Sequence, residues 1–377
     1  MMISRRNFMA VAGAAAAAAA LTACGGSSSS TSTASSAASS SAASAAGSEA
    51  AGKIVKVALT CDTGTIDDES FNQACWSAVS AYMGDDCQYY IPEADASDED
   101  RETMIRQAVN DGAEVIVCVG YLYGASLAWA AEQYPDVKFI AIDVTQGDIG
   151  TDSIPTNCYC ITFKEEQAGY MAGYAIAKDG KTKLGFLGGM AVPAVIRYGY
   201  GFVQGADAAA KELNEKVEIN YSWQYGASFS ASPELQTMAA GWYQSGTEVI
   251  FACGGSMFAS VAAAAGAEEG KVVGVDVDQS GESPTVITSA MKGLADSAQW
   301  ALGKFYAGEF ASIGGVQTSL GANENAVGLP TATWSLTKWS VDSYKVMLQD
   351  IKDGKIAIDN NYDNLASTEN VTLNIVG

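Results

Sequence analysis

The sequence of 377 residues contains no histidine. Histidine is the commonest general base and a frequent transition-metal ligand, and it is a member of the Ser/His/Asp and Cys/His nucleophile systems. Its absence counts against an enzyme of those classes and against a metal site built on imidazole. We therefore expect no metal and no cofactor.

Basic residues are also scarce, since 21 Lys and Arg stand against 43 Asp and Glu, for a formal net charge of -22. Nucleic acids and anionic membrane surfaces attract positive charge, so this balance opposes both as direct partners. Solubility is the plain reason for so acidic a chain. We expect no nucleic-acid partner.

No Cys-x-x-Cys pair occurs among the 8 cysteines. Those after Cys24 are odd in number, and positions 158 and 160 would point to opposite faces of a strand, so neither a metal set nor complete pairing is indicated. Several stand within apolar runs, where cysteine acts as a small apolar residue. Buried free thiols are favoured over a disulfide framework for Cys61, Cys75, Cys87, Cys118, Cys158, Cys160 and Cys253.

The first residues are predicted to be an export signal, 1–23, with a basic start at Arg5-Arg6 and a short apolar stretch. The segment LTAC resembles the lipobox at which a lipoprotein is cleaved and lipidated on Cys24. Both the twin-arginine and the ordinary secretory route remain open. Residues 24–52 form a Ser/Ala-rich tether that has too little apolar surface to fold. The protein is therefore expected on the extracytoplasmic face of the cell membrane, held by a lipid anchor.

After the tether, short apolar segments alternate with amphipathic helical patterns, as in KIVKVALTC, CQYYIP, EVIVCVG and KFIAID. Strands that alternate with helices predict parallel sheets covered on both faces. The rhythm restarts after NCYCITF and runs through KLGFLGG, EVIFACGG and KVVGVDVD. The fold class is therefore α/β, with two doubly wound lobes and a ligand cleft at the carboxyl ends of the strands.

Polar and aromatic residues gather at those strand ends. A carboxylate can accept two hydroxyl hydrogen bonds at once, which suits the vicinal diol of a sugar and disfavours a phosphate. Phe71 offers a face for an aromatic ring, and the Asn72 amide can donate to and accept from a base edge. The candidate ligand-binding residues from this pattern are Asp67, Asp68, Phe71, Asn72, Asp143, Gly254, Gly255 and Asp276.

The segment GTIDDESFNQACWSAV resembles the basic membrane lipoprotein family, the substrate-binding proteins of nucleoside ABC importers typified by a purine nucleoside receptor. The resemblance continues in register through FKEEQAGYMAGYAIA, LGFLGGMAVPAVIRYGYGFVQGADAA, YGASFSASPE, EVIFACGGSMF, VVGVDVDQS and VITSAMKGLADSA. It covers essentially everything after the tether. Two departures are the loop CGGSMF, where the family more often has small residues, and Val277, where a polar residue is commoner.

The resemblance implies a type I periplasmic-binding-protein fold with three hinge crossings, closing on a purine nucleoside and docking on permease subunits. Carried over by position, Phe71 would stack on the base, Asn72 would bond its edge, and Asp143 would lie near the base. Asp276 would take the ribose hydroxyls. Phe229 would be the opposing stacking face, and Lys292 would lie beside the ribose.

Lobe boundaries follow from the expected hinges near 162–164, 283–286 and 312–316. The N-terminal lobe is predicted to comprise 53–163 plus 285–312. The C-terminal lobe is predicted to comprise 164–284 plus 313–377.

Each candidate also has a purely structural interpretation. Asp67, Asp68 or Ser70 could cap the following helix, with Ser70 and Gln73 as a capping box. Phe71 could be a core residue, Asp143 and Asp276 solvated strand-end acids, and Lys292 a surface charge. Alternative functions are a receptor for a pentose or small sugar-like signal and a calcium-dependent nucleoside hydrolase. The stacking phenylalanines argue against the first, and the dispersion of the acids argues against the second.

Overall fold

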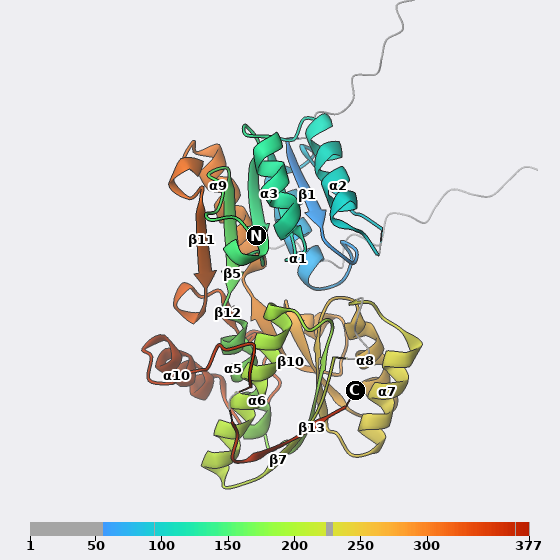
Figure 1. Ribbon diagram of the computed structural model, residues 1–377. Coiled ribbons are helices and arrows are strands. Elements are labelled where there is room, and N and C mark those ends of the chain that lie inside the picture. Colours follow the sequence, from blue (N-terminus) through green and yellow to red (C-terminus); the bar gives the residue numbers. More distant parts are fainter. Residues whose placement is uncertain (1–55, 94, 224–228, 366, 377) are drawn as a thin grey trace, which may run out of the picture. The chain divides into compact units, whose positions relative to one another are not determined.

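The computed structural model describes residues 56–93, 95–223, 229–365 and 367–376. The predicted signal peptide (1–23), Cys24 and the tether (24–52) lie outside the described residues. The described residues belong to one compact unit, 52–377, which contains two β-sheets with helices on their faces (Figure 1). The predicted α/β architecture of two parallel-sheet lobes is confirmed.

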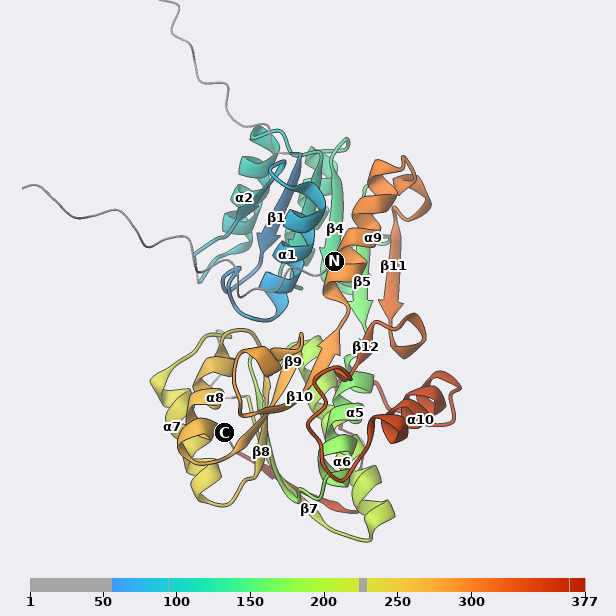
Figure 2. The same ribbon diagram turned by 180° about the vertical axis from the view of Figure 1, so that it is seen from behind.

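The sheet of the first lobe has the strand order β11-β5-β4-β3-β1-β2, with parallel pairs throughout. Its strands are β1 (Val57–Cys61), β2 (Cys87–Tyr90), β3 (Val115–Val119), β4 (Lys138–Ile142), β5 (Cys158–Phe163) and β11 (Val316–Leu320). Its helices are α1 (Phe71–Met83), α2 (Asp98–Asn110), α3 (Tyr123–Gln133), the short α4 (Gln146–Ile149) and α9 (Leu294–Tyr306). Helices α1 and α9 lie on one face of this sheet and α2 and α3 on the other (Figures 1 and 2).

The two faces of this sheet follow from the alternation of side chains along its strands. Val57 and Leu59 of β1 share one core cluster with Val79 of α1, whereas Ala58 shares another with Ile105 of α2. Successive residues of a strand point to opposite faces, and a strand covered on both faces is apolar throughout. All five residues of β1 are accordingly buried.

The sheet of the second lobe has the order β12-β10-β9-β8-β6-β7-β13, in which β12 pairs antiparallel with β10 and the other pairs are parallel. Its strands are β6 (Lys183–Gly188), β7 (Val217–Ser222), β8 (Val249–Cys253), β9 (Lys271–Asp276), β10 (Val286–Lys292), β12 (Val327–Gly328) and β13 (Val371–Ile375). Its helices are α5 (Glu165–Lys178), α6 (Pro193–Leu213), α7 (Pro233–Gln244), α8 (Met257–Ala267) and α10 (Val341–Lys352). Single 3₁₀ turns occur at η2 (Gln279–Gly281) in this lobe, at η3 (Phe310–Ser312) between α9 and β11 of the first lobe, and at η4 (Ala322–Glu324) between β11 and β12.

Helices α5 and α6 approach each other closely because glycines stand at their contact. A Cβ at Gly169 would lie 2.1 Å from the carbonyl oxygen of Tyr198, and one at Gly201 would lie 2.2 Å from the carbonyl oxygen of Glu166. A side chain at either position would force the helices apart. The glycines therefore fix how the start of α5 faces the start of α6.

Within the described residues, the chain passes between the two sheets three times, after β5, β10 and β11. The first crossing, between β5 and α5, lies at Lys164, inside the predicted hinge 162–164.

The other two crossings were predicted wrongly. The sequence-based boundary assigns 285–312 to the first lobe, but β10 pairs with β9 in the second sheet. It assigns 313–377 to the second lobe, but β11 pairs with β5 in the first. The crossings therefore lie at Gly293 and within 321–326. The hydrogen-bonded neighbour of a strand decides which lobe it joins, and that pairing is not visible in the sequence.

The cysteines are packing residues in the described part of the chain. Cys61, Cys75, Cys118, Cys158, Cys160 and Cys253 are buried free thiols, as predicted, and Cys87 is buried with its thiol donating to the carbonyl oxygen of Gly84. Among the described residues, no helix has both the length and the apolar character needed to cross a bilayer.

Candidate functional site

The carboxyl ends of strands from both lobes line one cavity, which leaves about 110 Å³ open to the centres of water-sized molecules. Nine of the ten predicted ligand-binding residues line it: Asp68, Phe71, Asn72, Asp143, Phe229, Gly254, Gly255, Asp276 and Lys292. The tenth, Asp67, is exposed and is not among the lining residues. The residues that the sequence placed at separate strand ends are thus brought together.

The start of α1 is capped by Asp68. Its carboxylate accepts hydrogen bonds from the backbone N–H groups of Ser70, Asn72 and Gln73 at 3.0–3.1 Å. The predicted Ser70–Gln73 capping box is wrong, because the Ser70 hydroxyl instead donates to Asp276 Oδ2 of the other lobe over 2.7 Å. One of the three candidate caps is therefore a cap, and another links the lobes.

Phe71 and Asn72 are presented to the cavity by the first turn of α1. The Asn72 Nδ2 group donates to the carbonyl oxygen of Thr63 over 2.9 Å, which fixes the amide. Its Oδ1 is buried and accepts no hydrogen bond from the described residues. A buried unsatisfied acceptor is costly unless a partner reaches it. The Asn72 amide is therefore poised to accept from a ligand.

Phe229 lies against the glycine loop that follows β8. A Cβ at Gly254 would be 2.5 Å from Phe229 Cδ1, and one at Gly255 would be 2.9 Å from the carbonyl oxygen of Phe229. Both glycines have positive φ, 148° and 43°. Both positions therefore require glycine for two reasons: the backbone conformation disfavours other residues, and a side chain would collide with Phe229. Of the departure CGGSMF, Ser256 lines the cavity and Met257 is buried in the core.

Lys292 is a lining residue of the cavity whose side chain is only 2% exposed. Its Nζ contacts Asp143 Oδ2 of the first lobe at 2.5 Å and Glu165 Oε1 at 3.0 Å. It also lies 4.9 Å from the ring centroid of Phe71. Burial alone would lower the pKa of Lys292, but the carboxylates of Asp143, Glu165 and Asp276 hold it above its usual value. The surface-charge interpretation of Lys292 is thus excluded.

Asp143 and Asp276 occupy equivalent places after β4 and at the end of β9, and both have left-handed backbones, with φ of 61° and 66°. Such conformations cost free energy in non-glycine residues and persist where surrounding structure imposes them. Burial raises the pKa of both, that of Asp143 to about 6, although Lys292 opposes the rise. Asp143 Oδ1 is buried and without a hydrogen bond from the described residues. Neither acid is a solvated strand end.

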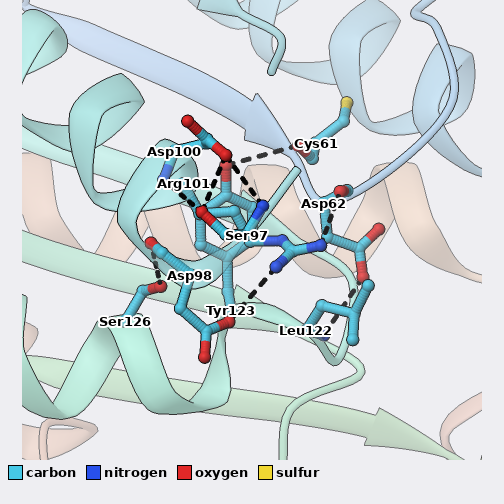
Figure 3. Close-up of polar contacts among 9 residues, drawn as sticks. All are labelled: Cys61, Asp62, Ser97, Asp98, Asp100, Arg101, Leu122, Tyr123 and Ser126. Carbon is cyan, nitrogen blue, oxygen red and sulfur yellow. Dashed lines mark hydrogen bonds and ion pairs between the residues drawn. The ribbon is translucent and has the colours of Figure 1, made fainter. Parts of the chain in front are cut away.

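Asp62 is a lining residue that the sequence prediction missed. Its Oδ2 accepts from the backbone N–H of Leu122 over 3.1 Å, and Arg101 Nη2 donates to its carbonyl oxygen over 3.4 Å (Figure 3). A Cβ at Gly120 would lie 2.1 Å from Asp62 Cγ, so the neighbouring turn leaves room for this carboxyl. Burial raises the pKa of Asp62 to about 7. An acid directly after an apolar strand was the signal used for Asp143, and it applies equally here.

Residues from helices α5 and α6 were also missed. Arg197 and Tyr198 line the cavity from the second turn of α6. Glu165, which is not a lining residue, forms an ion pair with Arg197. The Tyr198 hydroxyl donates to Asp276 Oδ1 over 3.3 Å. Arg197 and Tyr198 lie inside a helix, where no strand-end pattern identifies them. Glu165 begins α5 two positions after the end of β5, so the strand-end signal could have found it.

Negative charge predominates in the cavity wall. Five carboxyl groups line it, on Asp62, Asp68, Asp143, Asp148 and Asp276, against the two cations Arg197 and Lys292. Lys292 is already engaged by Asp143, and Arg197 by Glu165. An anionic ligand such as a phosphate would meet uncompensated carboxylates, so the cavity suits a neutral ligand with hydroxyl and N–H donors.

The chain is similar to known proteins in both sequence and fold. The family described as "ABC transporter substrate-binding protein PnrA-like" matches residues 54–362. The chain is 30% identical over 299 residues to basic membrane protein B of Borreliella burgdorferi, which covers 76% of this chain and 84% of that protein. It is 28% identical over 340 residues to the ABC transporter nucleoside-binding protein BmpA of Lactococcus lactis subsp. cremoris, covering 82% and 92%.

Solved structures share the fold. An ABC transporter solute-binding protein of Aeropyrum pernix superposes with a TM-score of 0.69 at 22% identity, covering 82% of this chain and 95% of that one. A solute-binding protein of Conexibacter woesei gives a TM-score of 0.63 at 23% identity, covering 81% and 99%.

Proposed function

The chain belongs to the family of PnrA-like ABC transporter substrate-binding proteins, and from that premise we propose that it binds a purine nucleoside between its lobes. Guanosine, inosine and adenosine are the candidate ligands. Members of this family are substrate-binding components of transporters and not enzymes. A bound ligand would stabilise the closed arrangement of the lobes, which then delivers it to the permease subunits.

The observation that carries this proposal is the composition of the cavity wall. Phe71 and Phe229 are aromatic side chains from opposite lobes that line the same cavity. Stacking on an aromatic side chain is worth about 1–3 kcal/mol per base. Asn72 and Asp143 each offer a buried oxygen with no hydrogen bond from the described residues. These oxygens suit the N–H groups on the edge of a purine.

The ribose is assigned to Asp276. Its carboxylate is held by Ser70 and Tyr198 and lines the cavity. A hydrogen bond from a sugar hydroxyl to a carboxylate contributes roughly 1.5–3 kcal/mol. Lys292, Gly254 and Gly255 line the same cavity. Asp68, whose carboxylate is occupied by the cap of α1, shapes the wall and bonds the ligand through a remaining lone pair.

Membrane attachment and partners follow the same premise. Two relatives carry the names basic membrane protein and nucleoside-binding protein. We infer that cleavage before Cys24 and lipidation of its thiol anchor this protein on the extracytoplasmic face, with residues 24–52 as a tether. Metabolic labelling with palmitate tests this inference. The protein should incorporate the label, and Cys24→Ser should abolish the incorporation.

A thermal-shift panel tests the ligand class. Guanosine, inosine and adenosine should raise the melting temperature, whereas their 5′-monophosphates, which bring negative charge to the carboxylates, should do so far less. Free ribose and free bases should stabilise weakly. Stabilisation by ribose as strong as that by inosine would overturn the nucleoside assignment and favour a sugar receptor. No stabilisation by any nucleoside would overturn it outright.

A further inference from the structure

Four charged side chains of alternating sign form a continuous chain of ion pairs, and three of the four line the cavity. Arg197 Nε lies 2.7 Å from Glu165 Oε2. Glu165 Oε1 lies 3.0 Å from Lys292 Nζ, which in turn lies 2.5 Å from Asp143 Oδ2. Arg197, Lys292 and Asp143 line the cavity, whereas Glu165 does not. Glu165 is thus the one member of this chain that connects two cavity cations without itself reaching the cavity.

These charges are almost completely removed from water. The Glu165 side chain is 0% exposed and that of Lys292 2%, while Asp143 and Arg197 are 12% and 15% exposed. A buried charge is tolerated only where opposite charge compensates it, and removing one partner leaves the other unpaired. Burial would raise the pKa of Glu165, yet Lys292 and Arg197 hold it below its usual value. Glu165 is therefore an anion with two cations fixed on it.

The position of Glu165 in the chain adds to its role. It is the first residue of α5 and follows Lys164, where the chain crosses from the first lobe to the second. Gly201 of α6 packs on the carbonyl oxygen of Glu166 in α5. This close helix contact sets the distance from Glu165 to Arg197. Asp143, at the other end, belongs to the first lobe. The charge chain consequently runs from the hinge to both walls of the cavity.

We propose that Glu165 is a positioning residue for ligand binding, whose carboxylate holds Lys292 against Asp143 of the opposite lobe and holds Arg197 in the cavity wall. Its effect on the ligand rests on the proposed function. Its effect on Lys292 and Asp143 does not, because those contacts exist without a ligand. Without the Glu165 charge, Lys292 keeps its contact with Asp143 and the nearby charge of Asp276, but Arg197 loses its ion-pair partner.

The first experiment replaces Glu165 by Gln, which keeps the shape and removes the charge. Nucleoside affinity measured by calorimetry should fall at least about tenfold, and Glu165→Asp, which keeps the charge on a shorter side chain, should restore part of it. The matched control is Glu212→Gln on the outer side of α6, where Glu212 pairs with Lys178. That control should bind like the parent protein.

The second experiment needs no ligand and follows the titration of Asp143 by carbon NMR of labelled aspartate, assigned with Asp143→Asn. The charged or titratable groups that face Asp143 are Lys292, Glu165, Arg197, Asp62, Cys75 and Tyr198. Glu165→Gln removes a negative neighbour, so Asp143 should titrate at lower pH, by about one pH unit. Arg197→Gln removes a positive neighbour, so Asp143 should titrate at higher pH. Opposite shifts from the two variants are not produced by a general loss of stability.

The outcomes separate the two proposals. If the parent protein binds no nucleoside, the proposed function fails, while the two opposite shifts would still establish that the Glu165 charge acts on Asp143 and Lys292. If the parent binds a nucleoside but Glu165→Gln leaves both the affinity and the Asp143 titration unchanged, the inference about Glu165 is overturned. Should Glu165→Gln fail to fold, Arg197→Gln decides by the direction of its shift, since an unchanged or lowered titration contradicts the charge chain.

Discussion

Phe71 is the residue on which the nucleoside assignment depends most directly. It lines the cavity at the first position of α1, and Lys292 Nζ lies 4.9 Å from its ring centroid. The sequence allowed Phe71 to be either a core residue or a stacking face. Its half-buried position in the cavity wall supports the second interpretation.

Replacing Phe71 by Ala should weaken purine nucleoside binding about 5- to 150-fold, the equivalent of losing 1–3 kcal/mol of stacking. Calorimetric titration measures this. Phe71→Leu, which keeps apolar volume without a π-face, should lose most of the same affinity, and Phe305→Leu on α9, which lies outside the cavity lining, should lose none. Full affinity in Phe71→Leu would show that the ring fills space without stacking.

Asp62 should make stability depend on pH. Its pKa is about 7 in the folded protein, because of burial, against an ordinary value near 4 when unfolded. Between these values the folded state binds the proton more tightly, so the stability that protonation gives is present below about pH 4 and is lost as pH rises to about 7.

The melting temperature of the ligand-free protein should therefore fall between pH 5 and pH 8, with Asp62 contributing on the order of 2 kcal/mol. Asp62→Asn should raise the melting temperature at pH 8 and change it little at pH 5, as scanning calorimetry can determine. The exposed control Asp342→Asn should show no such difference. A stabilisation that is equal at both pH values would mean that Asp62 does not titrate in this range.

At this scale the sequence predicts which residues face the cavity better than what each one does. Strand-end acids, Phe71 and the glycine loop were identified because the carboxyl ends of parallel strands must meet at one edge. Phe229 and Lys292 were identified only through the family resemblance. The hydrogen-bond partners of these residues were not identified. Ser70 donates to Asp276, which is more than 200 positions away, and Asp68 rather than Ser70 caps α1. Asp67 and Asp68 are adjacent acids after the same strand, so the sequence pattern gave no reason to distinguish them. Only the structure shows that Asp67 is exposed and Asp68 is buried.

Among the elements, the pair α5 and α6 positions Arg197 and Tyr198 in the cavity wall. Their close contact brings Glu165 of one helix to Arg197 of the other. Helix α5 is buried at twelve of its 14 residues, so it lacks the exposed polar side of an ordinary amphipathic helix. The repeated glycines in GYMAGY of α5 and GYGFVQG of α6 lie at the contact between the two helices. Most strands and helices could be predicted from periodicity, whereas the lobe membership of β10 and β11 could not, because it is set by long-range pairing.

Gly201→Ala should destabilise the protein by about 1–3 kcal/mol, because the new Cβ would meet the carbonyl oxygen of Glu166 at 2.2 Å. It should also weaken nucleoside binding by moving Arg197 relative to Glu165. Gly241→Ala in α7 is the matched control, since a Cβ there meets nothing within 4 Å. That change should be neutral or stabilising by up to about 1 kcal/mol in chemical denaturation. Equal effects of the two substitutions would contradict the close contact of α5 and α6.

For the whole folded unit, closure depends on contacts that join the lobes directly. Besides Lys292–Asp143 and Ser70–Asp276, the buried Gln279 of η2 donates from Nε2 to the carbonyl oxygen of Glu69 over 3.0 Å. Its Oε1 accepts from the backbone N–H of Val275 within its own lobe. Gln279 does not line the cavity, so it favours closure without contacting a ligand.

Gln279→Glu keeps the acceptor for Val275 and replaces the donor between the lobes by an oxygen that faces the Glu69 carbonyl. Affinity should fall about 5- to 30-fold, and small-angle scattering of the saturated protein should show a larger open fraction. Gln244→Glu, whose partner Glu268 belongs to the same lobe, should leave both the affinity and the scattering unchanged. An unaltered affinity in Gln279→Glu would mean that this bond contributes nothing to closure.

If a neutral nucleoside is held between the two lobes, a crystal structure of the protein grown with guanosine should show it there. The purine should lie between Phe71 and Phe229, with its edge on Asn72 and Asp143 and the ribose hydroxyls on Asp276. Density for guanosine elsewhere on the molecule, with the cavity between the lobes empty or filled by a ligand without a planar ring, would contradict it.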